Sequence, residues 1–432
     1  MKQIYVHFMG IGGSAIAGVA ILAKKFGFKV SGCDLEKETS YSHTLEKFNI
    51  KYFVGHNVTH LKDVDIVAVS AAVYPVKSPH PEVIEAKKRK ILMSWQKFQA
   101  VYLQKGKTVI AIAGTHGKST TTAMIGLMME EVGLDPTVEV GALVPKWQST
   151  VRFGQSKYFV CEADEFNNNF LNYSPGIIII NNLEMDHPEF FHNFDEFKDA
   201  FKKFIQKIKE PKILIVNKED KNIQELLIEM GNWLKKEKVR VVDFYRGEIF
   251  NLKIPGVHNE TNARAAIACG RELNIDFAKI KKALANFTGI NRRFELIGEK
   301  RGIKVYEDYA AHPTAIKATL QAAREKYPDK KIWAIFEPHQ YSRLKMFLHD
   351  FARALDLADK VVVTKIFSGR EKDDGTIKAQ DLVAILGRKA VYEPDFGIVS
   401  QKLSSQVVKK SFIIVFGCGK AYLLSKMILG KL

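Results

Sequence analysis

A short run of small and polar residues, GTHGKSTTT at 114–122, has the residue types needed to hold a polyphosphate. It directly follows the apolar run TVIAIA at 108–113, which predicts a buried strand. Glycines let a backbone fold closely around phosphate oxygens, and a helix starting near Lys118 would point its free N–H groups at the same anion. Lys118 would reach the terminal phosphates, and Ser119 or Thr120 would offer an oxygen to Mg²⁺. The strict eight-residue form has a glycine where Ile112 stands, so this is a shortened phosphate loop; the alternative is a glycine turn that only starts a helix.

A second glycine loop lies near the N-terminus. The residues GIGGSA at 10–15 follow an apolar strand pattern, and Asp34 ends the next predicted strand. This arrangement resembles a dinucleotide fingerprint with alanine in the third glycine position. The pattern fits NAD, FAD or the diphosphate of a nucleotide sugar equally well, and a tight turn without a ligand is the alternative.

Acidic residues follow two further strand patterns. Glu162 comes after YFVC, and the sequence NNLEMDH brings His187 shortly after the run GIIII. Parallel strands deliver their carboxyl ends to one edge of a sheet, where the phosphate loop also lies. We therefore expect Glu162 and His187 to meet a metal ion held by Ser119. A histidine before a proline is also a common structural residue, which is the competing interpretation.

Two asparagines lie at the start of a predicted helix in GVHNETNA at 256–263. Asn259 is suited to capping that helix, and Asn262 lies one turn further on. Spacing alone favours helix capping and nucleotide binding equally.

Basic and acidic side chains also gather at predicted strand ends in the last third of the chain. Arg293 stands in RRFE, Asp308 and His312 in VYEDYAAHPT, and Arg343 in EPHQYSR. Arginine and histidine at such an edge suit an anionic substrate or transition state.

Strand and helix patterns alternate along the whole chain, which predicts an α/β protein with parallel sheets. We expect three domains: a Rossmann-like domain at 1–105, a central P-loop-type mononucleotide-binding domain at 106–288, and a second Rossmann-like domain at 289–432. The 432 residues suffice for three domains with large cores.

The amino-acid composition argues against several classes of function. The four cysteines (Cys33, Cys161, Cys269 and Cys418) are widely spaced, which favours reduced thiols over a disulfide frame or zinc site. The net charge is +17, but the lysines alternate with acidic and apolar residues, so we expect no nucleic-acid partner. No apolar run is long enough to span a bilayer and no signal peptide is recognisable, so we expect a cytoplasmic protein without a membrane partner.

Taken together and in this order, the motifs resemble the Mur ligases, the ATP-dependent enzymes that build the peptide of bacterial cell-wall precursors. The resemblance covers essentially the whole chain. It rests on HFMGIGGSAIAG, AGTHGKSTTT, CEADE, NNLEMDH, GVHNETNA, NRRFE, EDYAAHPT and EPHQYSR.

The resemblance implies a UDP-sugar domain, a domain for ATP and Mg²⁺, and a third domain that closes over the site. The implied UDP-sugar residues are Gly10, Gly12, Gly13, Ser14, Asp34 and Ser70. The implied ATP-binding residues are Gly114, Thr115, His116, Gly117, Lys118, Ser119, Thr120, Asn259, Asn262, Arg293 and Asp308, and the implied metal ligands are Ser119, Glu162 and His187. The implied catalytic residues are Lys118, His187, Arg293, His312 and Arg343.

The implied activity joins L-alanine to the carboxylate of UDP-N-acetylmuramate through an acyl phosphate. A ligase that recycles murein tripeptide onto the same sugar is the alternative within the family. An NAD-dependent dehydrogenase is the alternative from another class; it would explain the first glycine loop and leave GTHGKS unexplained. The sequence does not indicate an oligomeric state.

Three positions depart from the pattern of the alanine-adding members. Ala311 replaces the first of two adjacent histidines, Gln340 stands where many members have arginine, and Lys420 stands where an acidic or small polar residue is common. All three leave the identity of the added amino acid open. Some later-acting members carry a carbamylated lysine, and Lys202 or Lys203 lies at a similar distance past the histidine.

Overall fold

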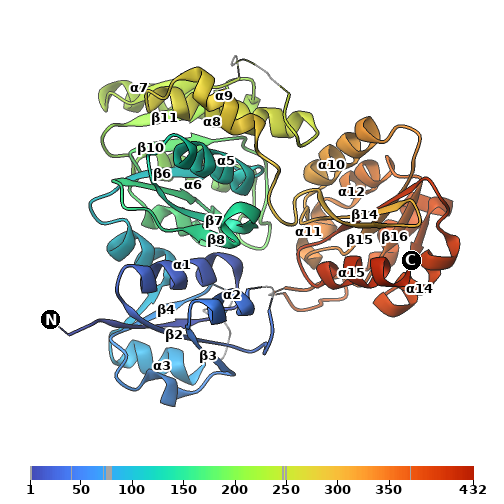
Figure 1. Ribbon diagram of the computed structural model, residues 1–432, viewed down its shortest axis with the longest axis horizontal. Coiled ribbons are helices and arrows are strands. Elements are labelled where there is room, and N and C mark those ends of the chain that lie inside the picture. Colours follow the sequence, from blue (N-terminus) through green and yellow to red (C-terminus); the bar gives the residue numbers. More distant parts are fainter. Residues whose placement is uncertain are drawn as a thin grey trace. The chain divides into compact units, whose positions relative to one another are not determined.

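The computed structural model describes residues 2–39, 41–71, 73, 80–245, 248, 251–369 and 371–432. Its strands form three sheets (Figure 1). The chain divides into two compact units. The first comprises Met1–Glu184, Asp195–Asn251 and Thr261–Phe287, and the second comprises Met185–Phe194, Leu252–Glu260 and Thr288–Leu432.

The first sheet of the first unit is parallel, with the order β3-β2-β1-β4-β5. Its strands are β1 (Tyr5–Met9), β2 (Lys29–Asp34), β3 (Lys51–Val54), β4 (Ile66–Val69) and β5 (Leu92–Ser94). Its helices are α1 (Ser14–Lys25), α2 (Ser42–Lys47), α3 (Pro81–Lys88) and α4 (Trp95–Phe98), with η1 (Val58–Leu61) and η2 (Gln99–Leu103). Strand order reverses on either side of β1, so the first glycine loop lies at the switch point where open α/β sheets bind ligands.

The second sheet of this unit has the order β12-β11-β10-β6-β9-β7-β8 and is parallel except for the β7–β8 pair. Its strands are β6 (Thr108–Ala113), β7 (Thr137–Val144), β8 (Ser149–Arg152), β9 (Tyr158–Glu162), β10 (Ile177–Ile180), β11 (Ile213–Val216) and β12 (Arg240–Asp243). The helices of this part of the chain are α5 (Lys118–Glu131), α6 (Phe194–Ile205), α7 (Lys221–Lys236), α8 (Val257–Glu272) and α9 (Phe277–Ala285), with η3 (Pro145–Trp147) and η4 (Phe166–Asn172). The second glycine loop follows β6, again where the strand order reverses.

The central strands of this sheet are apolar on both faces. β6 is buried from Val109 onward, and the four isoleucines of β10 are buried. A parallel sheet with both faces covered requires such continuous apolar strands. This burial fixes β6 and β10 firmly, so the loops at their carboxyl ends have a rigid base.

The sheet of the second unit has the order β13-β14-β18-β15-β16-β17 and begins with an antiparallel hairpin, β13 (Glu295–Lys300) and β14 (Ile303–Asp308). The remaining strands are parallel: β15 (Lys331–Phe336), β16 (Lys360–Val363), β17 (Ala390–Tyr392) and β18 (Ser411–Phe416). The helices are α10 (Pro313–Lys326), α11 (Tyr341–Met346), α12 (Leu348–Leu355), α13 (Ala379–Leu386), α14 (Phe396–Gln406) and α15 (Ala421–Lys431), with η5 (Gly387–Lys389).

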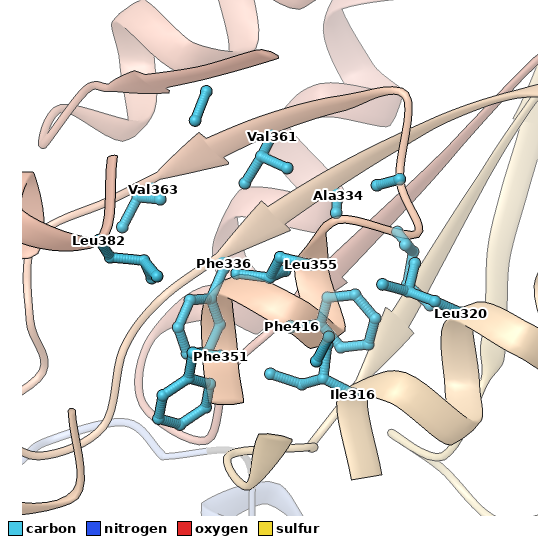
Figure 2. Close-up of a cluster of buried hydrophobic side chains, with 14 of the residues drawn as sticks. Ile316, Leu320, Ala334, Phe336, Phe351, Leu355, Val361, Val363, Leu382 and Phe416 are labelled. Carbon is cyan, nitrogen blue, oxygen red and sulfur yellow. The ribbon is translucent and has the colours of Figure 1, made fainter. Parts of the chain in front are cut away.

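One face of this sheet packs against helices α10, α12 and α13. Figure 2 shows Phe336 of β15 and Phe416 of β18 directed toward side chains of these helices, including Phe351 and Leu355. Phe336 and Phe351 have ring centroids 5.1 Å apart. Burial of such apolar area is the main stabilising contribution to a fold.

The predicted α/β class with three sheets is confirmed. The predicted domain boundaries at 105/106 and 288/289 stay a prediction, and two segments of the predicted central domain, Met185–Phe194 and Leu252–Glu260, belong to the second unit. Among the described residues, no helix is long and apolar enough to cross a membrane.

Candidate active site

The phosphate loop runs from the end of β6 to the first turn of α5. Gly117 is the residue before the helix and has a φ of +82°, a left-handed conformation that glycine adopts without strain. A Cβ at this position would lie 2.2 Å from Asn262 Oδ1. Gly114 has a φ of +119°, and a Cβ there would lie 2.9 Å from the carbonyl oxygen of Asn182. Both glycines are therefore required by conformation and by space.

Lys118 lies over its own loop. Its Nζ donates to the carbonyl oxygen of Gly114 at 2.6 Å and lies 2.9 Å from each carboxylate oxygen of Glu165. The Lys118 side chain is 16% exposed, whereas that of Glu165 is fully buried. Sequence reasoning did not select Glu165 as a site residue, although its position at the end of CEADE was a usable signal.

Two adjacent asparagines after β10 support the loop. Asn182 Oδ1 accepts the backbone N–H of His116 at 2.8 Å, and Asn181 Nδ2 donates to Thr121 Oγ1 at 3.0 Å. Thr121 Oγ1 in turn donates to Asn262 Oδ1 at 3.3 Å. The structure thus brings the predicted Asn262 to the loop, and it adds the two asparagines, which sequence reasoning did not select.

Two acidic residues lie on neighbouring strands near this edge of the sheet. Glu162 ends β9 and accepts the N–H of Gly141, while Glu139 of β7 is paired in register with Cys161. Glu139 is 1% exposed, and neither of its carboxylate oxygens has a hydrogen-bond partner among the described residues. Burial, followed by the charge of Glu162, raises the pKa of Glu139 well above its usual range. A buried carboxyl without a partner is costly, and oxygen-rich surroundings of this kind suit a divalent cation.

The predicted residues of the first glycine loop also converge. Asp34 Oδ2 accepts the N–H of Gly12 at 2.9 Å. Gly10 has a φ of +76°, and a Cβ there would lie 2.9 Å from Ser70 Cβ. Gly13 precedes α1 and Ser14 begins it, with no side chain capping the helix. The N–H groups of Gly10 and Ile11 donate to the Cys33 carbonyl oxygen and that of Gly12 to Asp34, so the loop is fixed against the end of β2 and leads into the first turn of α1. The binding of a UDP-sugar at this loop stays a prediction.

In the second unit, Arg343 of α11 forms a buried ion pair with Asp186. Arg343 Nη2 and Nε lie 2.7 and 3.0 Å from Asp186 Oδ1, and Nη1 donates to His339 Nδ1 at 2.9 Å. Burial opposes ionisation of Asp186, but the adjacent Arg343 holds the pKa of this carboxyl well below its usual range. The neighbouring His187 is oriented by Glu189, with Nδ1 3.1 Å from Oε1. A fixed positive guanidinium thus lies beside a carboxylate that stays ionised.

His312 caps helix α10 in the same unit. Its Nδ1 accepts the N–H of Thr314 at 3.3 Å, and its Nε2 donates to the carbonyl oxygen of Met185 at 3.2 Å. These two bonds fix the tautomer, with the proton on Nε2. The ring is 5% exposed, so the segment carrying Asp186 and the first turn of α10 are joined by a buried histidine.

Asp308 and Arg293 lie in the same unit. Asp308 accepts hydrogen bonds from the N–H groups of Phe294 and Ala310 and from Thr319 Oγ1, at 3.0, 2.8 and 3.1 Å. Burial raises the pKa of Asp308, which Arg293 partly opposes. The guanidinium of Arg293 lies 5.2 Å from the ring centroid of Tyr309. The carboxyl is therefore bound within its own unit.

Two further predicted positions have local partners. Asn259 Nδ2 donates to the carbonyl oxygen of Pro255 at 2.7 Å, which supports the start of α8. Lys202 forms ion pairs with Asp199 and Glu229, and the Glu229 hydrogen bond is the main cause that raises the pKa of Lys202. Carbamylation requires a neutral amine, so this lysine is poorly suited to that modification.

The predicted metal ligands divide between the two units. Ser119, buried in the first turn of α5, and Glu162 belong to the first unit, and His187 belongs to the second. Within the first unit β6 and β9 are neighbours, with Ile112 opposite Glu162, so the phosphate loop and the Glu162 carboxyl follow adjacent strands. The structure therefore brings Ser119 and Glu162, two of the three predicted metal ligands, to the same edge of this sheet.

The fold and the phosphate loop define an α/β nucleotide-binding protein with a second glycine loop in its N-terminal sheet. Models of three Mur ligase domains match successive parts of the chain. They are the Mur ligase family catalytic domain at 5–99, the Mur ligase middle domain at 112–270, and the Mur ligase glutamate ligase domain at 292–419.

Relatives match over the full length. The UDP-N-acetylmuramate–L-alanine ligase of Alkaliphilus metalliredigens is 36% identical, covering 99% of this chain and 97% of the relative. The enzyme of the same name from Acetivibrio thermocellus is 37% identical, covering 99% and 96%. The chain belongs to the Mur ligase family.

Solved structures agree with this assignment. The UDP-N-acetylmuramate–alanine ligase of Thermotoga maritima has a TM-score of 0.81 at 27% identity, covering 99% of both chains. A murein peptide ligase from Psychrobacter arcticus has a TM-score of 0.76 at 24% identity, covering 99% of this chain and 98% of that one, and shows the shared fold. These findings leave the dehydrogenase interpretation without support.

Proposed function

We propose that this protein is an ATP-dependent ligase that joins L-alanine to the lactyl carboxylate of UDP-N-acetylmuramate. The observation that carries the proposal is the phosphate loop, in which Lys118 is held by Glu165 beside its own backbone. The full-length likeness to ligases named for this reaction supports the choice of substrates. The same likeness favours alanine over murein tripeptide, because the murein peptide ligase neighbour shares the fold alone.

The reaction has two steps. In the first, a carboxylate oxygen of the sugar attacks the γ-phosphorus of ATP, the bond from that phosphorus to the β–γ bridging oxygen breaks, and ADP leaves. In the second, the alanine amine attacks the acyl carbon of the resulting acyl phosphate. The tetrahedral intermediate then expels inorganic phosphate and the amine loses a proton, which leaves an amide.

Lys118 supplies positive charge to the first step. Its ammonium group and the N–H groups at the start of α5 would lie around the bound phosphates, where charge spreads over the oxygens during transfer. Glu165 holds this ammonium group in the structure described, so phosphate oxygens would exchange with that carboxylate. Asn262 fixes the loop from the side of α8.

Ser119, Glu162 and His187 would hold Mg²⁺, and the charge of Glu162 acts on the buried carboxyl of Glu139. Bound Mg²⁺ would neutralise charge on the β- and γ-phosphate oxygens. The orphaned carboxyl of Glu139 fits this arrangement, because a cation nearby would offset the repulsion between the two acids.

Residues of the second unit would serve the nucleotide and the second substrate. Arg293 and Asp308 would reach the nucleotide together with Asn259, while His312 and Arg343 would lie near the acyl phosphate and the amino acid. Arg343 is positioned for this role by its pairing with Asp186, which keeps the guanidinium in one orientation. The first glycine loop, with Asp34 and Ser70, would bind the UDP-sugar.

The proposal is tested by the requirement for all three substrates. Purified protein is incubated with ATP, Mg²⁺, UDP-N-acetylmuramate and one amino acid or murein peptide at a time, and product mass and phosphate release are measured. We expect phosphate release only when sugar and amino acid are both present, and a product mass matching the L-alanine amide. Product formed with the tripeptide and not with alanine would reassign the second substrate. ATP hydrolysis independent of the sugar would refute the ligase function.

A further inference from the structure

Four potential metal-binding side chains lie together in the N-terminal sheet, away from the phosphate loop. They are His7 of β1, Cys33 of β2, His60 of η1 and Glu82 of α3, and their ligand atoms all lie within 4.8 Å of one another. His7, Cys33 and Glu82 are fully buried, at 0% exposure. The function proposed above gives none of them a role.

The fold brings these residues together from distant parts of the sequence. β1 and β2 are parallel, with His7 opposite Ser31 and Met9 opposite Cys33. His7 and Met9 therefore share one face of the sheet, as do Ser31 and Cys33. Pro81 begins α3, which places Glu82 in the first turn of that helix.

The ligand atoms are close enough together for small shifts to bring them around one tetrahedral ion. Zinc–sulfur bonds of about 2.3 Å and zinc–nitrogen bonds of about 2.0–2.1 Å place neighbouring ligand atoms roughly 3.3–3.6 Å apart. His7 Nε2 lies 3.3 Å from Cys33 Sγ, and Cys33 Sγ lies 3.8 Å from Glu82 Oε1. His7 Nε2 lies 3.9 Å from Glu82 Oε1. The His60 Nδ1–Glu82 Oε1 pair, at 2.7 Å, would open slightly around an ion.

The charges of the cluster also call for a cation. Among the described residues, the ion-pair partners of the buried Glu82 are all histidines: His7, His56 and His60. A buried carboxylate needs a compensating positive charge. One divalent cation bound by neutral imidazoles, the Glu82 carboxylate and a Cys33 thiolate would bring the net charge of the site to zero.

The surroundings are dry and rigid, as in structural metal sites. The ring of His60 stacks on Phe53 with centroids 4.3 Å apart. Cys33 belongs to an apolar cluster with Met9, Leu61, Val67 and Val83. An apolar shell orients the ligands and limits exchange with solvent.

We propose that His7, Cys33, His60 and Glu82 bind a zinc ion that stabilises the N-terminal sheet next to the first glycine loop. A thiolate combined with imidazoles selects zinc over Mg²⁺ and Ca²⁺. His56 Nδ1 lies 3.1 Å from both Cys33 Sγ and Glu82 Oε2, so this histidine supports the site from outside the four ligands. The sequence prediction of four non-ligating thiols is replaced at Cys33 by this proposal.

The proposed ion would also be coupled to the loop. The carbonyl oxygen of Cys33 accepts the N–H groups of Gly10 and Ile11 at 2.8 and 3.2 Å, and the next residue, Asp34, accepts that of Gly12. Fixing the Cys33 side chain therefore fixes the backbone to which the loop is bonded. The site is structural and does not touch the reacting atoms.

The test uses the full-length protein and cobalt as a spectroscopic probe. Protein is treated with a chelator, freed of it, and titrated with Co²⁺. A sulfur-to-cobalt charge-transfer band, saturating at one ion per chain, is expected for the wild type. Any Co²⁺ at an oxygen-liganded Mg²⁺ site gives no such band, so the readout is specific for a thiolate ligand. Zinc is expected to abolish the band by competition and to raise the Tm of the chelator-treated protein.

Matched serine variants identify the thiolate. Cys33→Ser should lose the cobalt band and the zinc-induced shift in Tm, whereas Cys269→Ser, which removes another buried thiol of the same unit, should keep both. Glu82→Gln should weaken zinc binding at least tenfold while keeping the band. Circular dichroism of each variant checks that it has folded. Absence of the band in chelator-treated wild type, or its persistence in folded Cys33→Ser, would overturn the proposal.

Discussion

The two glycine loops of the first unit occupy equivalent places in their sheets and are supported in different ways. Each follows a central strand at the point where the strand order reverses, and each leads into a helix. The first loop is braced by one carboxylate, Asp34, which accepts the N–H of Gly12. The second carries Lys118, which is paired with Glu165 and enclosed by asparagine side chains.

This difference separates binding from chemistry. A loop of N–H groups at a helix N-terminus binds a diphosphate without changing it. Phosphoryl transfer also requires positioned positive charge and a cation. Among the described residues, the second loop carries a lysine bonded to its own backbone, and it follows the strand next to the one that ends at Glu162. The same backbone arrangement thus serves two tasks, and the side chains decide which.

The largest effect is expected from Lys118→Ala. Removing the ammonium group should lower kcat by about a thousandfold, as loss of a group that stabilises transition-state charge does, with little change in the KM for the UDP-sugar. Steady-state kinetics with each substrate varied in turn measures both. Lys62→Ala, which removes an exposed lysine of the same unit, is the control and should be unaffected. A Lys118→Ala enzyme with wild-type kcat would remove the distinction between the loops.

Alanine substitutions at Gly117 and Gly12 test whether the two loops bind different ligands. Gly117→Ala forces a left-handed alanine, which costs roughly 1–2 kcal/mol, and displaces Asn262, so the KM for ATP should rise at least tenfold. Gly12→Ala places a Cβ 2.9 Å from Asp34 Oδ2 and should raise the KM for the UDP-sugar instead. If both variants impaired the same substrate, the assignment of one ligand to each loop would be wrong.

The local parts of both loops were predictable from the sequence. Gly117, Lys118 and Asp34 stand at fixed offsets from apolar strands, and short-range backbone physics predicts a strand, a tight turn and a helix at those offsets. The orphaned carboxyl of Glu139 was not predictable. It lies in an alternating run, TVEVGALV, and only the pairing of β7 with β9 places it beside Glu162.

The other features that the sequence did not predict depend on contacts between residues far apart in the chain. The antiparallel pairs β7–β8 and β13–β14 lie at the edges of largely parallel sheets and have no α-helix between their strands, so the expected alternation of strands and helices did not reveal them. His7, Cys33 and Glu82 are single residues in unrelated segments, and only the sheet register unites them. The capping role of His312 also depends on a partner distant in sequence, Met185.

The pH dependence of the free energy of unfolding should reveal the interaction between the carboxyls of Glu139 and Glu162. The folded pKa of Glu139 is raised, so the unfolded state releases its proton first as the pH rises. Without Mg²⁺, the free energy of unfolding should therefore fall as the pH rises above about 4.3, the pKa of an unperturbed glutamate, and level off above the folded pKa. Glu139→Gln should lack this decline and exceed wild type at pH 8 by roughly 1–3 kcal/mol.

Urea unfolding at a series of pH values measures the difference in the free energy of unfolding between Glu139→Gln and the wild type. This difference should vanish near pH 4. Mg²⁺ should stabilise the wild type more than Glu139→Gln, because a cation relieves the repulsion between Glu139 and Glu162. Glu38→Gln, which alters an exposed acid of the same unit, is the control. Parallel pH profiles for wild type and Glu139→Gln would show that Glu139 ionises normally and that the two acids are independent.

The smallest effect is expected at Asp34, the carboxylate that supports the first loop. Asp34→Asn keeps an acceptor for the N–H of Gly12, so the KM for the UDP-sugar should rise only about twofold. Asp34→Ala removes a hydrogen bond whose net contribution is about 0.5–1.5 kcal/mol, so it should raise that KM roughly two- to twelvefold. The KM for ATP should stay constant in both, since the second loop has its own supports. Titration calorimetry with the UDP-sugar alone separates binding from turnover. Equal losses of affinity for the UDP-sugar in the two variants would mean that the negative charge of Asp34, and not its acceptor geometry, determines the conformation of the loop. Both loops would then depend on a charged side chain.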